Sequence, residues 1–114
     1  MPYLSLHTNC EVSAARKPKI LRFLSKLVQT ETSKPESSIM VTVYPNESIL
    51  FAGEEMPAAF VEFKSIGLQE TDTARISKAI CLAVEQELGI SSKRIYINFT
   101  NVNPRMWGWD KQTF

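Results

Sequence analysis

The stretch Ala58–Gly67, AAFVEFKSIG, decides how this chain can fold. It is apolar at almost every position and is followed by a glycine, a pattern that predicts a strand. A strand that is apolar on both faces is usually covered on both faces. We therefore expect this strand to pack against helices on one side and against a second cover on the other.

A helix is predicted on either side of that strand. The first lies in KPKILRFLSKLVQT (17–30) and should begin close to Pro18, because proline is tolerated only in the first helical turn. The second begins at Glu70 and Asp72, whose charges suit a helix N-terminus, and stops at Gly89. The buried stripes are expected at Ile20, Leu24, Leu27 and Val28, and at Ile76, Ala79, Ile80, Ala83, Val84 and Leu88.

Three more strands complete the pattern: PYLSLH (2–7), IMVTVYP (39–45) and RIYINFTNV (94–102). The order strand, helix, strand, strand, helix, strand predicts an α+β fold of the split β-α-β type, with a four-stranded sheet and two helices on one face. A chain of 114 residues forms one domain, 1–114. It has only two helices to offer, so the second cover of the sheet is expected to be another copy of the chain.

Composition excludes several classes of protein. Hydrophobic residues make up 44%, charged residues 22%, and the formal net charge is +1, which argues against a nucleic-acid partner. No apolar run approaches the ~20 residues of a membrane span, and we expect no signal peptide, because the first residues lack a charged region followed by an apolar core. We expect a cytoplasmic protein, or one secreted without a signal peptide. Cys10 and Cys81 are expected to be reduced thiols, and a single histidine, His7, predicts no His-rich metal site.

Five residues stand out for chemistry: Pro2, Lys34, Ile66, Tyr96 and Asn98. Tyr96 and Asn98 are two apart in a strand and share one face. Polar groups on a covered sheet face need partners or a site. Taken singly, each residue also has an ordinary interpretation, such as a solvated lysine at a helix end, a turn, or a half-buried strand aromatic.

Five short motifs occur in order along the chain: MP at the start, SKP after the first helix, SIG after the third strand, RIYIN in the last strand, and GWDKQTF at the end. On these motifs the chain resembles the macrophage migration inhibitory factor family of the tautomerase superfamily, over essentially its whole length. The resemblance implies the split β-α-β fold and a homotrimer whose sheets form a central barrel, with sites at the subunit interfaces.

The resemblance also implies roles for single residues. Pro2, freed of Met1, would be the general base, because an apolar pocket disfavours its cationic form. Lys34 would bind a substrate carboxylate or the enolate oxygen, and the Ile66 N–H would be a second donor. Tyr96 and Asn98 would come from the neighbouring subunit. The apolar rim would be formed by Tyr3, Trp107 and Phe114.

The function implied is a keto–enol tautomerase for small aromatic keto acids such as phenylpyruvate, working without cofactor or metal. The alternative is a cytokine-like signalling or partner-binding protein that keeps a vestigial pocket, with an unknown receptor. RNA binding is disfavoured, because RIYINFTNV lacks a glycine-rich basic pattern.

The chain also departs from the family at several positions. Ala58 to Val61 stand where the animal cytokine has a Cys-x-x-Cys pair, so no thiol-redox activity is expected. Ser38, Lys64 and Trp107 replace an aromatic residue, a histidine and a small aliphatic residue, so the pocket mouth should be reshaped.

Overall fold

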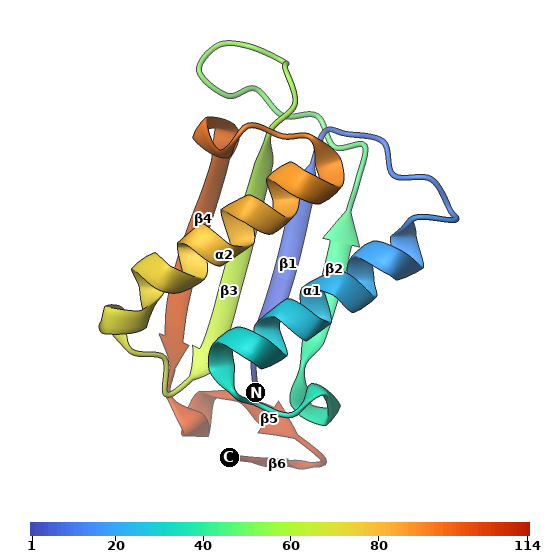
Figure 1. Cartoon of the computed structure of the whole chain (residues 1–114). Coiled ribbons are helices and arrows are strands. Elements are labelled where there is room, and N and C mark those ends of the chain that lie inside the picture. The colour runs from blue at the N-terminus through green and yellow to red at the C-terminus, as the bar shows by residue number, and fades with distance from the viewer.

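Four strands form one mixed sheet, and two helices lie across one of its faces (Figure 1). The computed structural model describes all residues, 1–114. The sheet order is β2-β1-β3-β4, with β1 parallel to β2, antiparallel to β3, and β3 parallel to β4. This confirms the predicted split β-α-β fold. The main elements are β1 (Tyr3–Thr8), α1 (Lys17–Thr32), β2 (Met40–Tyr44), β3 (Ala59–Ile66), α2 (Glu70–Leu88) and β4 (Ile95–Val102).

Short elements join and extend this framework. Single 3-10 turns lie before β2, before β4 and after β4, at η1 (Glu36–Ser38), η2 (Ser92–Arg94) and η3 (Pro104–Met106). The tail forms a small hairpin of β5 (Gly108–Trp109) and β6 (Gln112–Thr113). The sequence predicted extra pieces in the tail but not this strand pair.

Both helices begin where the local signals place them, and α2 ends at the predicted Gly89, whereas α1 continues two residues beyond the predicted stretch 17–30, to Thr32. Pro18 lies in the first turn of α1, and Glu70 and Asp72 lie in the first turn of α2. Gly89 ends α2 with a φ of 69°, a left-handed conformation that glycine adopts without strain. Neither helix is both long enough and apolar enough to cross a membrane. The residues most buried on the two helices are Ile20, Leu24 and Val28, and Ile76, Ile80, Ala83 and Val84.

The core lies between the helices and the inner face of the sheet. Leu4 and Leu6 from β1, with Val61 and Phe63 from β3, are at most 1% exposed. The Phe63 ring packs at a tilt on Phe99 of β4, with 5.8 Å between the centroids. Every second strand residue therefore faces the helices, as the alternation in the strands predicts.

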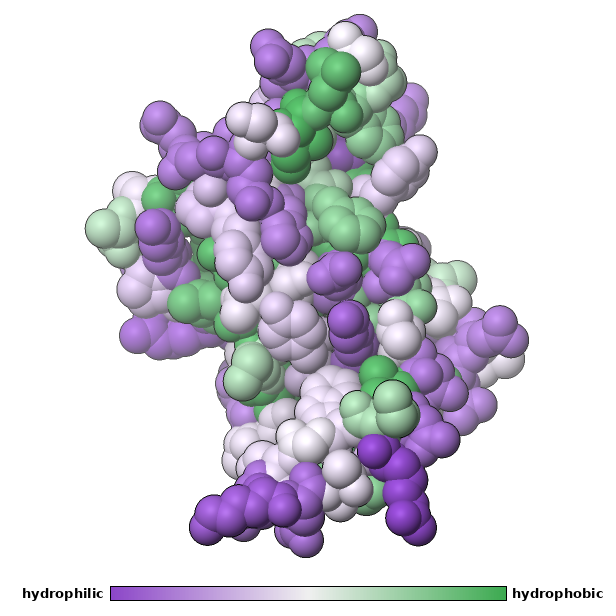
Figure 2. All heavy atoms as spheres, turned by 180° about the vertical axis from the view of Figure 1, so that it is seen from behind, coloured by the Kyte–Doolittle hydropathy of each residue, from purple (hydrophilic) through white to green (hydrophobic).

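The outer face of the sheet is more polar than expected. The expectation of an apolar second face was wrong for β3, because its alternation turns Val61 and Phe63 inward and Glu62 and Lys64 outward. Figure 2 shows this face as a mixture of hydrophilic and weakly hydrophobic residues. Strand pairing arranges its side chains in three rows: Met40, Tyr3, Lys64 and Thr100; Thr42, Ser5, Glu62 and Asn98; and Tyr44, His7, Phe60 and Tyr96.

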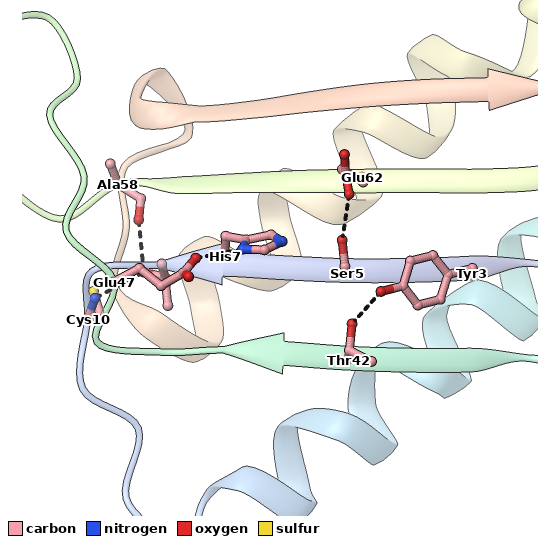
Figure 3. A network of polar contacts seen from close by, with 9 residues as sticks. Tyr3, Ser5, His7, Cys10, Thr42, Glu47, Ala58 and Glu62 are labelled. Atoms are coloured by element: carbon pink, nitrogen blue, oxygen red, sulfur yellow. Dashed lines mark hydrogen bonds and ion pairs between the residues drawn. The ribbon is translucent and has the colours of Figure 1, made fainter.

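Hydrogen bonds across the strands pair some of the polar groups of this face (Figure 3). The Tyr3 hydroxyl lies 2.8 Å from Oγ1 of Thr42, and Ser5 Oγ donates to Glu62 over 3.4 Å. The outer face is thus a structured surface in which polar pairs lie beside aromatic rings.

Thr8 carries a buried hydroxyl that should matter for stability. The residue is 0% exposed; its Oγ1 donates to the Ala58 carbonyl over 2.8 Å and accepts from the Cys10 N–H over 3.1 Å (Figure 3). We predict that Thr8→Val lowers the free energy of unfolding by about 1–3 kcal/mol, because the buried Ala58 carbonyl and the partly buried Cys10 N–H both lose this partner. Urea unfolding at one fixed protein concentration would measure this.

The matched control is Thr30→Val on α1, which is exposed and has no such contacts. Its unfolding free energy should change by at most about 0.5 kcal/mol. Equal losses in the two variants would contradict the assigned role of the Thr8 hydroxyl.

Candidate active site

A cleft of about 920 Å³ opens at the end of the sheet where β1 begins. Three parts of the chain meet there: the first three residues, the segment around η1, and the end of β4 with the tail. Figure 1 shows the N-terminus, η1 and the β5–β6 hairpin together at this end of the molecule. The lining residues are Met1, Pro2, Tyr3, Pro35, Ser37, Ser38, Ile39, Met40, Lys64, Thr100, Val102, Met106, Trp107, Gly108, Trp109 and Phe114.

Pro2 lies buried in this lining, less than 2% exposed, directly before β1. Its carbonyl accepts a hydrogen bond from the Met40 N–H over 3.1 Å, which ties the start of the chain to β2. The proline nitrogen has no hydrogen to give, so its position before the ladder costs the sheet nothing. Pro2 is therefore held on a rigid element at the edge of the cleft.

The surroundings of Pro2 disfavour a positive charge on an amine. Burial, and secondarily the charge of Lys34, lower the pKa of the Met1 amino group below its ordinary value. Both causes act in the same direction on a cation. An amine at this end of β1 thus loses its proton at a lower pH than a solvated amine does.

Lys34 reaches this region from the end of α1. Ser33 takes a left-handed conformation with a φ of 59° and turns the chain, and the Lys34 N–H donates to Thr32 Oγ1 over 3.3 Å. Lys34 is half-buried and forms no ion pair within the chain. It lies outside the cleft lining itself, but its charge acts on the amine beside Pro2.

The tail hairpin supplies the aromatic part of the lining. Asp110 and Lys111 both have positive φ, 50° and 67°, the geometry of a tight two-residue hairpin turn. The hairpin stacks Trp109 on Phe114 with 5.8 Å between ring centroids. Tyr3, Trp107 and Phe114 all line the cleft. Trp109 was missed, because no glycine or asparagine marked the turn that folds it back.

Two residues singled out in β4 lie away from this cleft. Tyr96 is at the other end of the sheet, six residues before Val102, which corresponds to about 20 Å along a strand. Tyr96 is 64% exposed, and Asn98 shares its face. Ile66, paired with Val102, ends β3 next to the cleft but does not line it. The chain alone therefore brings Pro2 and Lys34 together and leaves Tyr96 and Asn98 for another surface.

Arg94 organises the loop around Tyr96. Its guanidinium donates to the backbone carbonyls of Phe51, Glu54, Met56 and Pro57 over 2.9–3.1 Å, and it lies 5.0 Å above the Phe51 ring. Phe51 in turn packs edge-on against Tyr96, with 4.8 Å between centroids. This role of Arg94 could not be predicted from the sequence, because all four acceptors are backbone carbonyls.

The possible metal ligands and the two cysteines lie apart from the cleft chemistry described above. No three His, Cys, Asp or Glu side chains converge where a metal ion could bind. Cys10 and Cys81 are free, and neither lines the cleft. Burial raises the pKa of the Cys81 thiol above its ordinary value, which keeps it protonated and unreactive near neutral pH.

Two β-α-β units that share one four-stranded sheet, with both helices on one face, form the fold of the tautomerase superfamily. The chain belongs to the macrophage migration inhibitory factor (MIF) family, whose sequence model matches residues 1–114. A macrophage migration inhibitory factor of Rattus norvegicus is 35% identical over 118 residues, covering 100% of this chain and 99% of the relative.

Solved structures agree with this family. The homologue from Prochlorococcus marinus has 34% identity and a TM-score of 0.93, with 98% of each chain covered. The factor from Trichinella spiralis has 32% identity and a TM-score of 0.90, covering 98% of this chain and 99% of that one. The likeness extends over the sheet, both helices and the cleft end of the molecule.

We predict that Arg94→Lys loosens the loop 51–57 while the sheet remains folded. Lysine keeps the charge but cannot bond four carbonyls at once. The amides of Phe51 and Glu54, each bonded to the other's carbonyl over 3.0 Å, should exchange hydrogen about tenfold faster or more, since a charged hydrogen bond contributes roughly 1.5–3 kcal/mol. Arg22→Lys on the exposed face of α1 is the control. Unchanged exchange at both amides would show that the loop holds without Arg94.

Proposed function

We propose that this chain is a cofactor-independent keto–enol tautomerase for small aromatic keto acids, with Pro2 as the general base once Met1 is removed. The observation that carries the proposal is the buried position of Pro2, in a largely apolar cleft where burial and Lys34 lower the pKa of the adjacent amine. Membership of the family supports the same assignment.

The proposed reaction is a proton transfer between carbon and oxygen. With Met1 absent, the Pro2 nitrogen is a secondary amine with a free electron pair. It takes a proton from the carbon next to the keto group and becomes a cation, and negative charge develops on the keto oxygen. The Pro2 cation then gives up its proton to that oxygen, which yields the enol and restores the neutral amine. The rigid ring directs the electron pair without the rotational freedom of a primary amine.

Two donors are proposed for the substrate. Lys34 binds the carboxylate or steadies the developing enolate oxygen, and the Ile66 N–H is a second donor at the end of β3. The aromatic lining formed by Tyr3, Trp107 and Phe114 packs against the substrate ring. No step needs an electron acceptor or a metal-bound water.

The proposed site is completed by a second copy of the chain. Tyr96 and Asn98 lie on the outer face of the sheet and do not line their own cleft. They precede Thr100, the nearest lining residue of β4, by four and two residues, roughly 13 Å and 7 Å by strand rise. We propose a homotrimer in which these two residues enter the cleft of a neighbour. The polar pairs and aromatic rings of the outer face would be covered in that assembly.

The first test concerns the amine. Met1-free protein should convert phenylpyruvate, and its activity should rise with pH as the Pro2 amine loses its proton. Burial and Lys34 lower the pKa of the Met1 amine at this place, and we expect the same two causes to act on the Pro2 amine, so that activity rises at a lower pH than the titration of a solvated amine. Protein that retains Met1, or carries an alanine inserted before Pro2, should lose nearly all activity, because the nitrogen is then an amide. Mass spectrometry of each sample fixes its N-terminus, and equal turnover by blocked and free forms would exclude Pro2 as the base.

The second test concerns assembly. Sedimentation at micromolar concentration should show one trimeric species. Chains with an alanine inserted before Pro2 should be inactive, and Tyr96→Ala chains should be impaired. Refolding the two together should restore activity, since a mixed trimer contains sites with an intact Pro2 from one chain and an intact Tyr96 from the other. A folded monomer, or mixtures no more active than their parts, would show that Tyr96 does not act across subunits.

A further inference from the structure

The cleft lining contains a lysine that the proposed reaction does not use. Lys64 lies on the outer face of β3 and lines the cleft, half-buried. It is the cross-strand neighbour of Tyr3, which places its Cβ about 5 Å from that of Tyr3, the residue that follows Pro2. Its side chain forms no ion pair within the chain.

No acidic group neutralises this lysine from the cleft. The lining contains no aspartate or glutamate, and nine of its 16 residues are hydrophobic. Glu62, the next outward-facing residue of β3, accepts a hydrogen bond from Ser5 instead of pairing with Lys64. Lys64 thus presents a positive charge to a largely apolar cleft without an acidic side chain to pair with it, so an anionic ligand is the group that would complement it.

The two lysines reach this end of the sheet from different layers. Lys34 follows α1, which covers the inner face, whereas Lys64 stands on the outer face. Pro2 and Tyr3 lie at the strand start between these layers. A substrate with one carboxylate that binds Lys34 leaves Lys64 unpaired.

We propose that the preferred substrates are aromatic keto acids with a second anionic group on the ring, and that Lys64 binds this group. The keto-acid part rests on the function proposed above, while the pairing of Lys64 with an anion does not. Lys64 thereby selects a doubly charged substrate over phenylpyruvate. The cleft volume of about 920 Å³ leaves room for such a molecule.

The test compares matched ligands with one and two carboxylates on the assembled protein. Terephthalate should bind about tenfold tighter than benzoate or more, as expected for one additional charge-assisted hydrogen bond. Lys64→Met should remove most of that preference, while Lys19→Met, an exposed lysine in the first turn of α1, should retain it. The preference should shrink as salt is raised. Titration calorimetry measures all six combinations of protein and ligand.

A turnover arm uses 4-carboxyphenylpyruvate and phenylpyruvate on the Met1-free protein. The ratio of kcat/KM for the two substrates should fall about tenfold in Lys64→Met and remain unchanged in Lys19→Met. If neither substrate is converted, the proposed tautomerase function fails, and the binding arm still decides the role of Lys64.

Two results would overturn the role given to Lys64. One is equal binding of terephthalate and benzoate by the unaltered protein, or a preference that survives Lys64→Met. The other is a Lys64→Met variant that shifts only the pH profile of phenylpyruvate turnover. That outcome would make Lys64 an electrostatic neighbour of Pro2 and not a ligand-binding residue.

Discussion

The position of β1 between β2 and β3 is the constraint on which the site depends. β1 pairs on both sides, and its inward residues Leu4 and Leu6 are almost fully buried. A strand held in this way cannot shift its register without moving its apolar residues to the wrong face. The residue that precedes it, Pro2, is therefore fixed in place and tied to Met40 by its carbonyl. Placing the proposed base at the start of a central strand supplies positional precision that a loop would lack.

The sequence predicted those parts of the fold that depend on local rules. Pro18 and Gly89 mark helix ends because proline fits only a first turn and glycine accepts a left-handed φ. The alternation in β2 and the shared face of Tyr96 and Asn98 likewise follow from the period of a strand. The stretch AAFVEFKSIG was misleading on one point. Its many apolar residues suggested a strand that is apolar on both faces, although Glu62 and Lys64 point outward.

The parts that could not be predicted depend on contacts between distant residues. Arg94 bonds to carbonyls 37 to 43 residues away, and a carbonyl has no identity in the sequence. The tail hairpin turns at Asp110 and Lys111, two residues for which positive φ is unusual. The position of Trp109 in the cleft lining and the lack of an acidic neighbour for Lys64 there also depend on contacts between distant parts of the chain, so the sequence did not show them.

The cleft also shows why a chain of this size would need another copy for the proposed chemistry. A small domain buries a limited share of its surface, and here one open side of the cleft borders the outer face of the sheet. Tyr96, expected to close a neighbour's cleft, is oriented within its own chain by Phe51, and Phe51 is held by Arg94. The packing that orients Tyr96 is thus complete before assembly, so little conformational freedom would be lost when Tyr96 enters the neighbouring site. Activity would then depend on assembly, because the proposed site combines Pro2 of one chain with Tyr96 of the next, which is oriented by the loop that Arg94 holds.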